Sequence, residues 1–336
     1  MRSSSNRRAV LITSAAAGLA ALVALTVLWP AAPAAAQQVA DSTFLPVVGA
    51  PAYAAGEGPL VQLDEAHHNF HTASGRFLPF ARLLERDGYR VEPQRERFTR
   101  AALARTRVLV VSNALADDGD WVLPARPAFT ADEVAAVRDW VNDGGSLLLI
   151  ADHMPFPGHA QALAAALGVA FQDGFALDAD ANDRLGRFRR VNGSLATHPV
   201  TQGRDASERV DSVRTFTGQA FRLLHGGTPL LVFDSTCVVW LPQEAWQFGR
   251  LTPHVPGEGM VQGALLELGR GRVAVFGEAA MFSAQRSGPN RNPSGMNAPG
   301  AERNGQFVLN LMHWLTRLPG LEPETGGTRP RPRGGR

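Results

Sequence analysis

Residues 108–153 read VLVVSNALADDGDWVLPARPAFTADEVAAVRDWVNDGGSLLLIADH, and this stretch decides the fold. Its two ends, 108–111 and 146–151, are unbroken apolar runs of the kind found in strands that are buried on both faces. Between them, Thr130 and Glu133 have the spacing of a capping box, and Gly144-Gly145 follows the helix that they predict. A strand, a helix and a strand with short connections predict parallel strands joined by a right-handed crossover.

The same alternation continues on both sides of this unit. Further strands are expected at 60–63, 89–92, 230–233, 263–268 and 272–276. Further helices are expected at 77–87, 160–167 and 304–318, the last one capped by Asn304. Residues 170–222 are polar and irregular and predict an insertion with a hairpin, and Gly269-Arg270-Gly271 predicts a second hairpin turn. The sequence therefore predicts an α/β protein with a doubly wound, mostly parallel sheet, an irregular insertion and a C-terminal β-hairpin.

The N-terminus has the parts of a secretory signal peptide over residues 1–36. Arg2, Arg7 and Arg8 precede an apolar run of 21 residues, and Ala34-Ala35-Ala36 forms a small-residue exit. These features predict export to the periplasm or the medium, by the Sec or the twin-arginine route. The alternative is an uncleaved anchor, because 21 apolar residues can span a bilayer, and membrane contact is expected only through that segment. The expected organisation then continues with a linker at 37–58, one domain at 59–318 and a disordered Arg/Pro/Gly tail at 319–336.

The amino-acid composition excludes several kinds of catalytic and binding site. The chain has 336 residues, 45% of them hydrophobic and 19% charged, which is typical of a globular protein. All 33 basic residues are arginines, so Schiff-base chemistry and the P-loop lysine are excluded. The single cysteine, Cys237, excludes an intrachain disulfide and a multi-cysteine zinc site. Nucleic-acid binding is not expected, because the basic residues do not gather on a predicted element. Three arginines close in the sequence, Arg187, Arg189 and Arg190, are compatible with an anion site or with a solvated charged face.

Polar residues gather where the predicted strands end. In an open parallel sheet, ligands bind outside the carboxyl ends of the strands, beside the point where the strand order reverses. The residues that follow the strands there are Asp64, Glu65, His67, His68, Asn69 and His71 in the first loop, Ser112 and Asn113 in the second, Asp152 and His153 in the third, and Glu278 in the last. If the predicted strands 60–63 and 108–111 are neighbours in the sheet, the first two of these loops border the same crevice.

Three interpretations of this group remain open. A divalent metal, zinc or manganese, would take its ligands from Asp64, His67, His68 and Asp152. Acid–base catalysis would use Glu65, His68 and Glu278, since a histidine exchanges its proton near neutral pH. In the structural interpretation, Asp64 and His67 hydrogen-bond the loop, and Asn69 and Thr72 start the next helix. A bound ligand would contact Asn69, Ser112, Asn113 and His153.

Three segments resemble a known family: 64–72 (DEAHHNFHT), 152–158 (DHMPFPG) and 304–315. The resemblance is to an uncharacterised, domain-of-unknown-function branch of the class I glutamine amidotransferase-like superfamily, and it covers about residues 59–318. It implies a flavodoxin-like fold. Related domains occur in gliding-motility and transport-associated membrane proteins and in intraflagellar transport proteins. The nucleophilic cysteine elbow of the true amidotransferases is replaced here by Asp152-His153, so glutaminase activity is not expected.

The sequence thus favours an exported, non-glutaminase module that binds an unidentified ligand or protein of the cell envelope, such as a sugar or a peptide. The alternative is a metal-dependent hydrolase acting on an envelope carbohydrate, ester or peptide, with Glu65 or Glu278 as the general base. In either case the Gly/Pro/Asn-rich stretch 287–300 is a candidate lid over the site.

Overall fold

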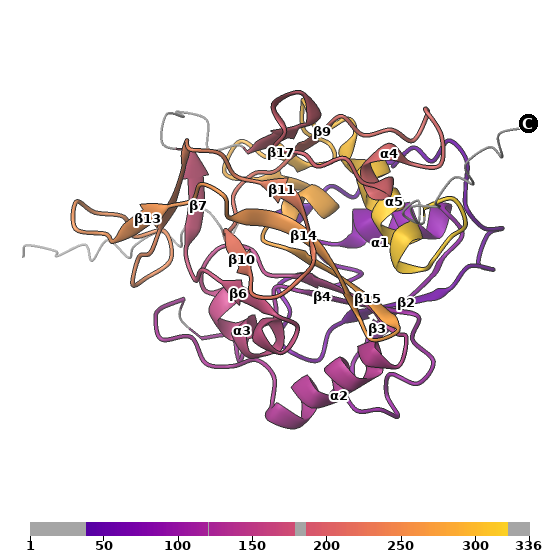
Figure 1. Ribbon diagram of the computed structural model, residues 1–336, viewed down its shortest axis with the longest axis horizontal. Coiled ribbons are helices and arrows are strands. Elements are labelled where there is room, and N and C mark those ends of the chain that lie inside the picture. The colour runs from indigo at the N-terminus through magenta and orange to yellow at the C-terminus, as the bar shows by residue number, and fades with distance from the viewer. Residues whose placement is uncertain (1–37, 120, 179–185, 322–336) are drawn as a thin grey trace, which may run out of the picture. The chain divides into compact units, whose positions relative to one another are not determined.

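The computed structural model describes residues 38–119, 121–178 and 186–321, and Figure 1 shows its elements. The predicted signal peptide and most of the predicted tail lie outside these ranges. The centre is a nine-stranded sheet with the order β3-β2-β4-β5-β15-β14-β10-β6, to which β11 adds by pairing with β14. Its strands are β2 (Leu60–Asp64), β3 (Arg90–Gln94), β4 (Val108–Ser112), β5 (Ser146–Ile150), β6 (Val169–Phe171), β10 (Phe221–Leu223), β11 (Thr228–Val232), β14 (Val261–Leu268) and β15 (Gly271–Phe276).

The five strands from β3 to β15 are parallel, and their order is that of a flavodoxin-like sheet. The remaining neighbours are antiparallel, beginning with the hairpin of β14 and β15. That hairpin turns at Gly269, where φ is +58°, a conformation that favours glycine. The predicted fold class is confirmed. Because β2 pairs with both β3 and β4, the loops that follow β2 and β4 border the same crevice.

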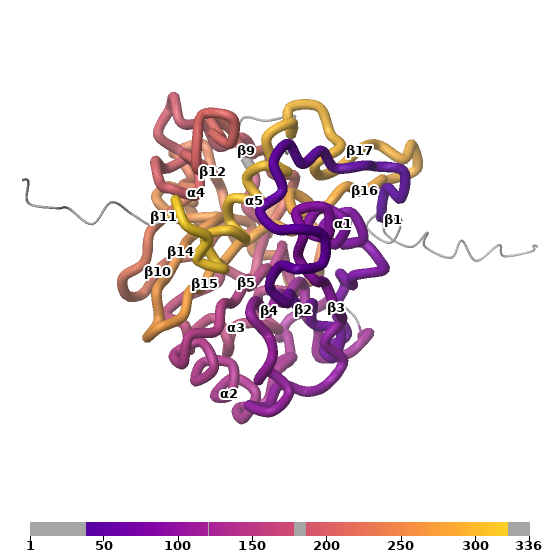
Figure 2. Tube along the Cα trace, turned by 90° about the vertical axis from the view of Figure 1, so that its right-hand side faces the viewer, coloured from indigo at the N-terminus to yellow at the C-terminus, as the bar shows by residue number. Residues whose placement is uncertain are grey.

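Helices cover both faces of the parallel strands, as Figures 1 and 2 show. The helices α1 (Leu78–Arg86) and α5 (Asn304–Leu315) pack on one face, and α2 (Ala131–Asn142) and α3 (Phe156–Ala166) pack on the other. Successive residues of a strand point to opposite faces, so each strand contributes to two apolar cores. In β4, Val110 lies in the core under α1 and α5, whereas Leu109 lies in the core under α2 and α3.

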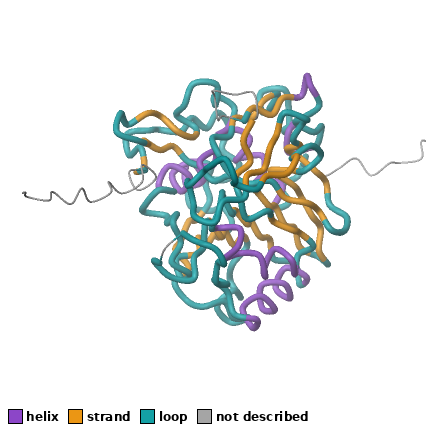
Figure 3. Tube along the Cα trace, turned by 90° about the vertical axis from the view of Figure 1, so that its left-hand side faces the viewer, coloured by secondary structure: helices purple, strands orange, loops and turns teal. Residues whose placement is uncertain are grey.

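Three smaller sheets surround this centre, and loops cover much of the face in Figure 3. Their strands are β1 (Val39–Ala40), β16 (Ala284–Ser287) and β17 (Asn292–Gly295) in one sheet, β7 (Phe175–Asp178), β12 (Cys237–Trp240) and β13 (His254–Pro256) in the second, and β8 (Arg187–Arg189) and β9 (Ser212–Arg214) in the third. The short helix α4 (Pro199–Gln202) lies within the insertion. Among the described residues, no helix is long and apolar enough to cross a membrane.

Two local predictions were wrong. Helix α3 begins at Phe156 rather than 160, since a proline in the first turn costs no helical hydrogen bond. Asn304 does not cap α5, because its side chain pairs with the backbone N–H and C=O of Arg214. The stretch 287–300 contains β17, which pairs with β16, and its role as a lid stays a prediction.

Candidate functional site

The loop after β2 is organised around His67, which is completely buried. Its Nδ1 lies 2.8 and 2.9 Å from the two carboxylate oxygens of Asp64, and its Nε2 lies 2.9 Å from Oε1 of Glu133. Each ring nitrogen therefore faces a carboxylate, which is the arrangement of an imidazolium. The ring also packs against Phe98 and Phe129, with centroid distances of 4.6 and 4.7 Å.

The opposite charges of this cluster attract one another. Burial by itself would lower the pKa of His67, but hydrogen bonds and attraction from Asp64 and Glu133 outweigh it and raise that pKa above 6.5. Burial would raise the pKa of Glu133, but hydrogen bonds from Thr130 and His67 lower it to about 2. Glu133 is also the capping-box residue of α2, as the sequence predicts. His67 thus ties the end of β2 to the start of α2.

The other polar residues of the first loop have local partners. The side chain of Asn69 accepts from the N–H of His67 and donates to Asp64. Glu65 accepts from the N–H of Ala73 at 3.0 Å. His68 has φ of +44° and turns outward, with its side chain 44% exposed and its Nδ1 3.3 Å from Asp118. The structural interpretation of Asp64 and His67 agrees with these contacts, although neither Asn69 nor Thr72 caps α1, which begins after Phe77.

The four predicted metal ligands do not form one site. Asp64 and His67 are in contact, but both nitrogens of His67 are engaged by carboxylates and His68 turns away. Asp152 accepts from the backbone N–H groups of His153 and Ala279. Within the described ranges, no three His, Cys, Asp or Glu side chains form a group that could hold a metal ion. The three predicted catalytic residues also have separate surroundings: Glu65 and His68 lie in the first loop with the partners given above, and Glu278 is buried after β15.

A second buried cluster lies where β5 and β15 end. The carboxylate of Asp152 accepts from the N–H groups of His153 and Ala279, at 2.8 and 3.2 Å. The carboxylate of Glu278 accepts from the N–H groups of Ala280 and Met281, at 2.7 and 2.8 Å. Burial raises the pKa of both groups, and the negative charge of Asp152 raises that of Glu278 further. These two carboxyls therefore ionise less readily than exposed ones.

The polar residues after β4 connect the two clusters. Oδ1 of Asn113 accepts from the N–H of Asp152 at 2.9 Å, and Oγ of Ser112 lies 3.2 Å from Nδ1 of His71. His71 is buried, and burial followed by the charges of Arg76 and His153 lowers its pKa well below 6.5. Ser112, Asn113 and Asp152 therefore lie together at the strand ends, and Ser112 and Asn113 are themselves buried.

His153 is the centre of an aromatic surface. Its ring stacks on Phe175 at 4.6 Å with an interplanar angle of 11°, and Trp246 meets it edge-on at 4.6 Å. The contacts continue outward to further rings. Seven of the connected rings are here called the aromatic platform: Phe70, Trp121, His153, Phe175, Trp240, Trp246 and Phe248. All except Phe175 and His153 are partly or largely exposed.

The hydrogen-bonding state of His153 makes it a candidate ligand contact. Burial lowers its pKa below 6.5, although the charge of Asp152 opposes this, so the ring is neutral at pH 7. Its Nδ1 donates to the carbonyl of Met154 at 2.7 Å, which leaves Nε2 as an acceptor that no described residue hydrogen-bonds. The indole Nε1 of Trp246, a donor, is also without a partner among the described residues. One acceptor and one donor therefore remain unsatisfied at this aromatic wall.

Sequence reasoning missed most of the aromatic platform. Trp121 lies in the loop after β4, whereas Trp240 and Trp246 lie more than a hundred residues further along the chain. Backbone pairing between the two loops brings them together: Leu123 donates to Gln243, and Ala245 donates to Trp121. Three of the five tryptophans in the described ranges fall in or beside these two loops. That concentration was the feature of the sequence from which the aromatic platform could have been predicted.

An acidic side chain beside α3 predicts a pH dependence of stability. Burial raises the pKa of Asp173 to about 7, and a hydrogen bond from the N–H of Gly158 offsets part of that effect. The folded protein then binds one more proton than the unfolded chain between about pH 4 and 7, so the free energy of unfolding falls as the pH rises through this window. We expect Asp173→Asn to remove the slope and to stabilise the protein by about 2 kcal/mol at pH 8.

Urea unfolding at pH 5 and pH 8 measures this effect. The matched control is Asp139→Asn on α2, since Asp139 is exposed and pairs only with Arg138 on its own helix. The control should keep the slope of the unaltered protein. An unchanged slope in Asp173→Asn would contradict the assignment.

Comparison with known proteins supports the fold. No protein-family model and no curated protein matches the sequence. The mmIFT52 N-terminal domain is similar in structure, with 14% identity and a TM-score of 0.53 over 76% of this chain and 97% of that domain. A cytoplasmic protein from Salmonella typhimurium LT2 has 14% identity and a TM-score of 0.43 over 76% and 99% of the two chains. A ThuA-like protein from Bacteroides uniformis has 12% identity and a TM-score of 0.42 over 80% and 94%.

These results correct the family assignment made from the sequence. The chain was expected to belong to an uncharacterised branch of the class I glutamine amidotransferase-like superfamily, and that assignment was wrong. No family model matches, and the similar structures share no more than 14% of their residues with this chain. Short motifs at strand ends are a weak family signal, because the same topology places polar residues there in unrelated proteins. The likeness to the mmIFT52 domain shows a common fold and nothing about activity.

Proposed function

We propose that the protein is an exported binding module of the cell envelope, and that its ligand, a carbohydrate, lies against the aromatic platform. Export rests on the sequence of residues 1–36. The binding role rests chiefly on one observation: partly exposed tryptophans surround a neutral histidine whose Nε2 has no protein partner.

The chemistry of this wall favours a carbohydrate over a charged ligand. Ligand sites are lined mainly by aromatic and apolar groups, with a few placed polar groups that fix orientation. A sugar ring presents apolar C–H faces to an indole and hydroxyl groups to a neutral acceptor and donor. His153 Nε2 is such an acceptor, and it carries no charge that a hydroxyl would leave uncompensated. Trp246 Nε1 is an unpartnered donor beside it, but this atom is buried. A metal-dependent hydrolase has no comparable support among the described residues.

The test uses the purified protein on an array of envelope-type oligosaccharides, with a peptide array in parallel. Trp246→Ala and Trp121→Ala should each weaken glycan binding about tenfold to thirtyfold, because aromatic anchors dominate such contacts. Trp140→Ala is the matched control, since Trp140 is a partly exposed tryptophan of α2 that packs beside Gly145, outside the aromatic platform. It should bind normally.

Three outcomes contradict the proposal. They are no binding to any glycan, binding to peptides alone, and equal weakening in all three tryptophan variants.

A further inference from the structure

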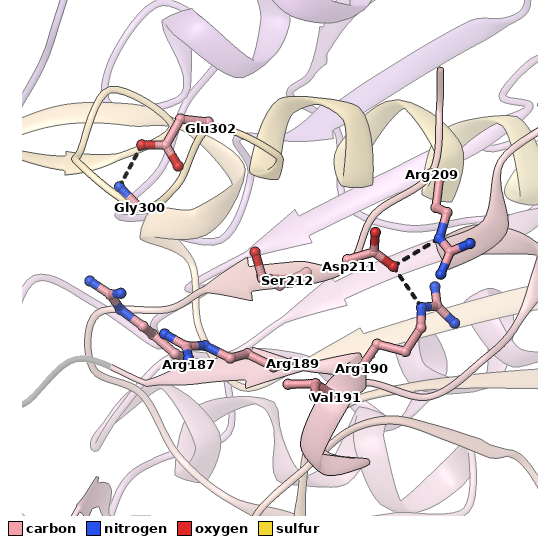
Figure 4. Close-up of a pocket in the computed structure, with 10 residues that line it drawn as sticks. Arg187, Arg189, Arg190, Val191, Arg209, Asp211, Ser212, Gly300 and Glu302 are labelled. Atoms are coloured by element: carbon pink, nitrogen blue, oxygen red, sulfur yellow. Dashed lines mark hydrogen bonds and ion pairs between the residues drawn. The ribbon is translucent and has the colours of Figure 1, made fainter. Parts of the chain in front are cut away.

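A groove with an excess of positive charge lies beside the two-stranded ribbon of β8 and β9. It has a volume of about 610 Å³, and the segment around Gly300 and Glu302 also borders it (Figure 4). Four of its lining residues are arginines and two are acids. The arginines are Arg187, Arg189, Arg190 and Arg209, and the acids are Asp211 and Glu302. The groove shares no residue with the aromatic platform.

The alternation of the ribbon places arginines on its outer face. Phe188 and Val213 face each other across the ribbon and are both buried in the core under α1 and α5. Because neighbouring residues of a strand point to opposite sides, Arg187 and Arg189 project together away from that core. Arg187 also lies directly opposite Arg214 in the register.

Neither acid is hydrogen-bonded to Arg187 or Arg189, although Glu302 is close enough to Arg187 for their opposite charges to attract each other. Oδ1 of Asp211 accepts from Nε of both Arg190 and Arg209, each at 2.9 Å, as the dashed lines in Figure 4 show. Oε1 of Glu302 accepts from the backbone N–H of Gly300 at 2.8 Å. No described residue forms a hydrogen bond or ion pair with the guanidinium of Arg187 or Arg189, and both side chains are exposed.

Arg190, by contrast, has a structural role. Besides Asp211, its guanidinium donates to Thr197 and to the carbonyls of Thr201 and Val210. It therefore holds the ribbon to the segment around α4 and is not available for a ligand. This division leaves Arg187 and Arg189 as the ligand-facing cations of the groove.

We propose that this groove binds the phosphate group of a small ligand, and that Arg187 and Arg189 hold it. The lining carries a surplus of two positive charges, which matches a phosphate dianion. Arg187 and Arg189 are two residues apart on one strand, so their side chains leave the same side of the ribbon from backbone positions about 7 Å apart. A tetrahedral phosphate offers oxygens in several directions and can accept from both forks, whereas a carboxylate is satisfied by one.

The test is calorimetric titration of the purified full chain with inorganic phosphate and pyrophosphate. Sodium chloride at matched ionic strength controls for screening. Arg187→Gln/Arg189→Gln should weaken binding at least tenfold. Arg86→Gln/Arg222→Gln is the matched control, because it removes two exposed positive charges elsewhere on the surface and should bind like the unaltered protein. If the first double variant fails to fold, the single variant Arg189→Gln takes its place.

A second arm identifies the source of the phosphate. Vesicles of phosphatidylcholine with and without phosphatidic acid are sedimented with each protein. Binding to free phosphate, or to phosphatidic acid vesicles, that is lost only in the Arg187/Arg189 variants supports the proposal and distinguishes a soluble from a lipid phosphate. No binding in either arm, or equal weakening by both charge-matched pairs, overturns it.

Discussion

Replacing His67 by alanine is expected to lower the free energy of unfolding by about 3–5 kcal/mol, the range for breaking a buried ion pair by removing one partner. Both ring nitrogens of His67 face carboxylates within 2.9 Å, and the ring is completely buried against Phe98 and Phe129. The variant leaves Asp64 buried without its cation and Glu133 with only the exposed Arg97, and it also leaves a cavity. Chemical denaturation followed by circular dichroism measures the loss.

His68→Asn is the matched control for this substitution. His68 is adjacent in the chain but exposed, and asparagine tolerates its positive φ. We expect a change within about 0.5 kcal/mol. If His67→Ala proves as stable as His68→Asn, the imidazolium cluster does not hold the fold. Should His67→Ala fail to fold, His67→Gln retains one hydrogen bond and permits the measurement.

His67 also gives a specific pH signature. Its pKa is raised in the folded state, so its stabilising effect is complete below about pH 6.5 and is lost as the pH rises through the folded value. Asp173, Asp152 and Glu278 also have raised pKa values and lower the stability as the pH rises, so the part of the fall that belongs to His67 is identified by comparing variants. That part should be absent from His67→Gln and present in His68→Asn.

Replacing Asp87 by alanine is the second substitution with a large expected effect, a loss of about 2–4 kcal/mol. Oδ2 of Asp87 accepts from Nε2 of His313 in α5 at 2.6 Å, and Oδ1 accepts from the N–H of Ala52 at 2.8 Å. Both side chains are buried. One carboxylate thus joins the end of α1 to α5 and to the segment before β2. Its removal leaves a buried imidazole and a backbone donor without their acceptor.

Asp143→Ala provides the comparison for Asp87→Ala. Asp143 holds the same place at the end of α2, but it is about half exposed and pairs with the exposed Arg100. Exposed pairs contribute about 0–1 kcal/mol, so this variant should be close to neutral. Hydrogen exchange supplies a second readout: in Asp87→Ala, the amides of Ala52 and Tyr53 should lose protection before those of β4. Unchanged exchange there would show that Asp87 does not fasten this segment.

The strand ends illustrate what sequence could and could not predict about the site. Their position followed from the alternation of strands and helices, and the structure confirms that the loops after β2 and β4 border one crevice. The role of each residue did not follow. His67 and His68 are neighbours in the chain, yet one is a buried cation and the other faces solvent, because the backbone turns into a left-handed conformation at His68.

The doubly wound sheet, the capping box of α2 and the hairpin of β14 and β15 could all be predicted from the sequence. Each depends on the spacing of apolar residues, on helix caps or on turn residues, and these act over a few neighbouring positions. Only the tertiary structure decided which polar residues are satisfied. The carboxylate that completes the His67 cluster, Glu133, lies 66 residues away, and His313 lies 226 residues from Asp87. The aromatic platform and the arginine groove likewise join segments that are distant in the chain, and burial, charge and hydrogen bonding between such segments depend on packing that no local pattern contains.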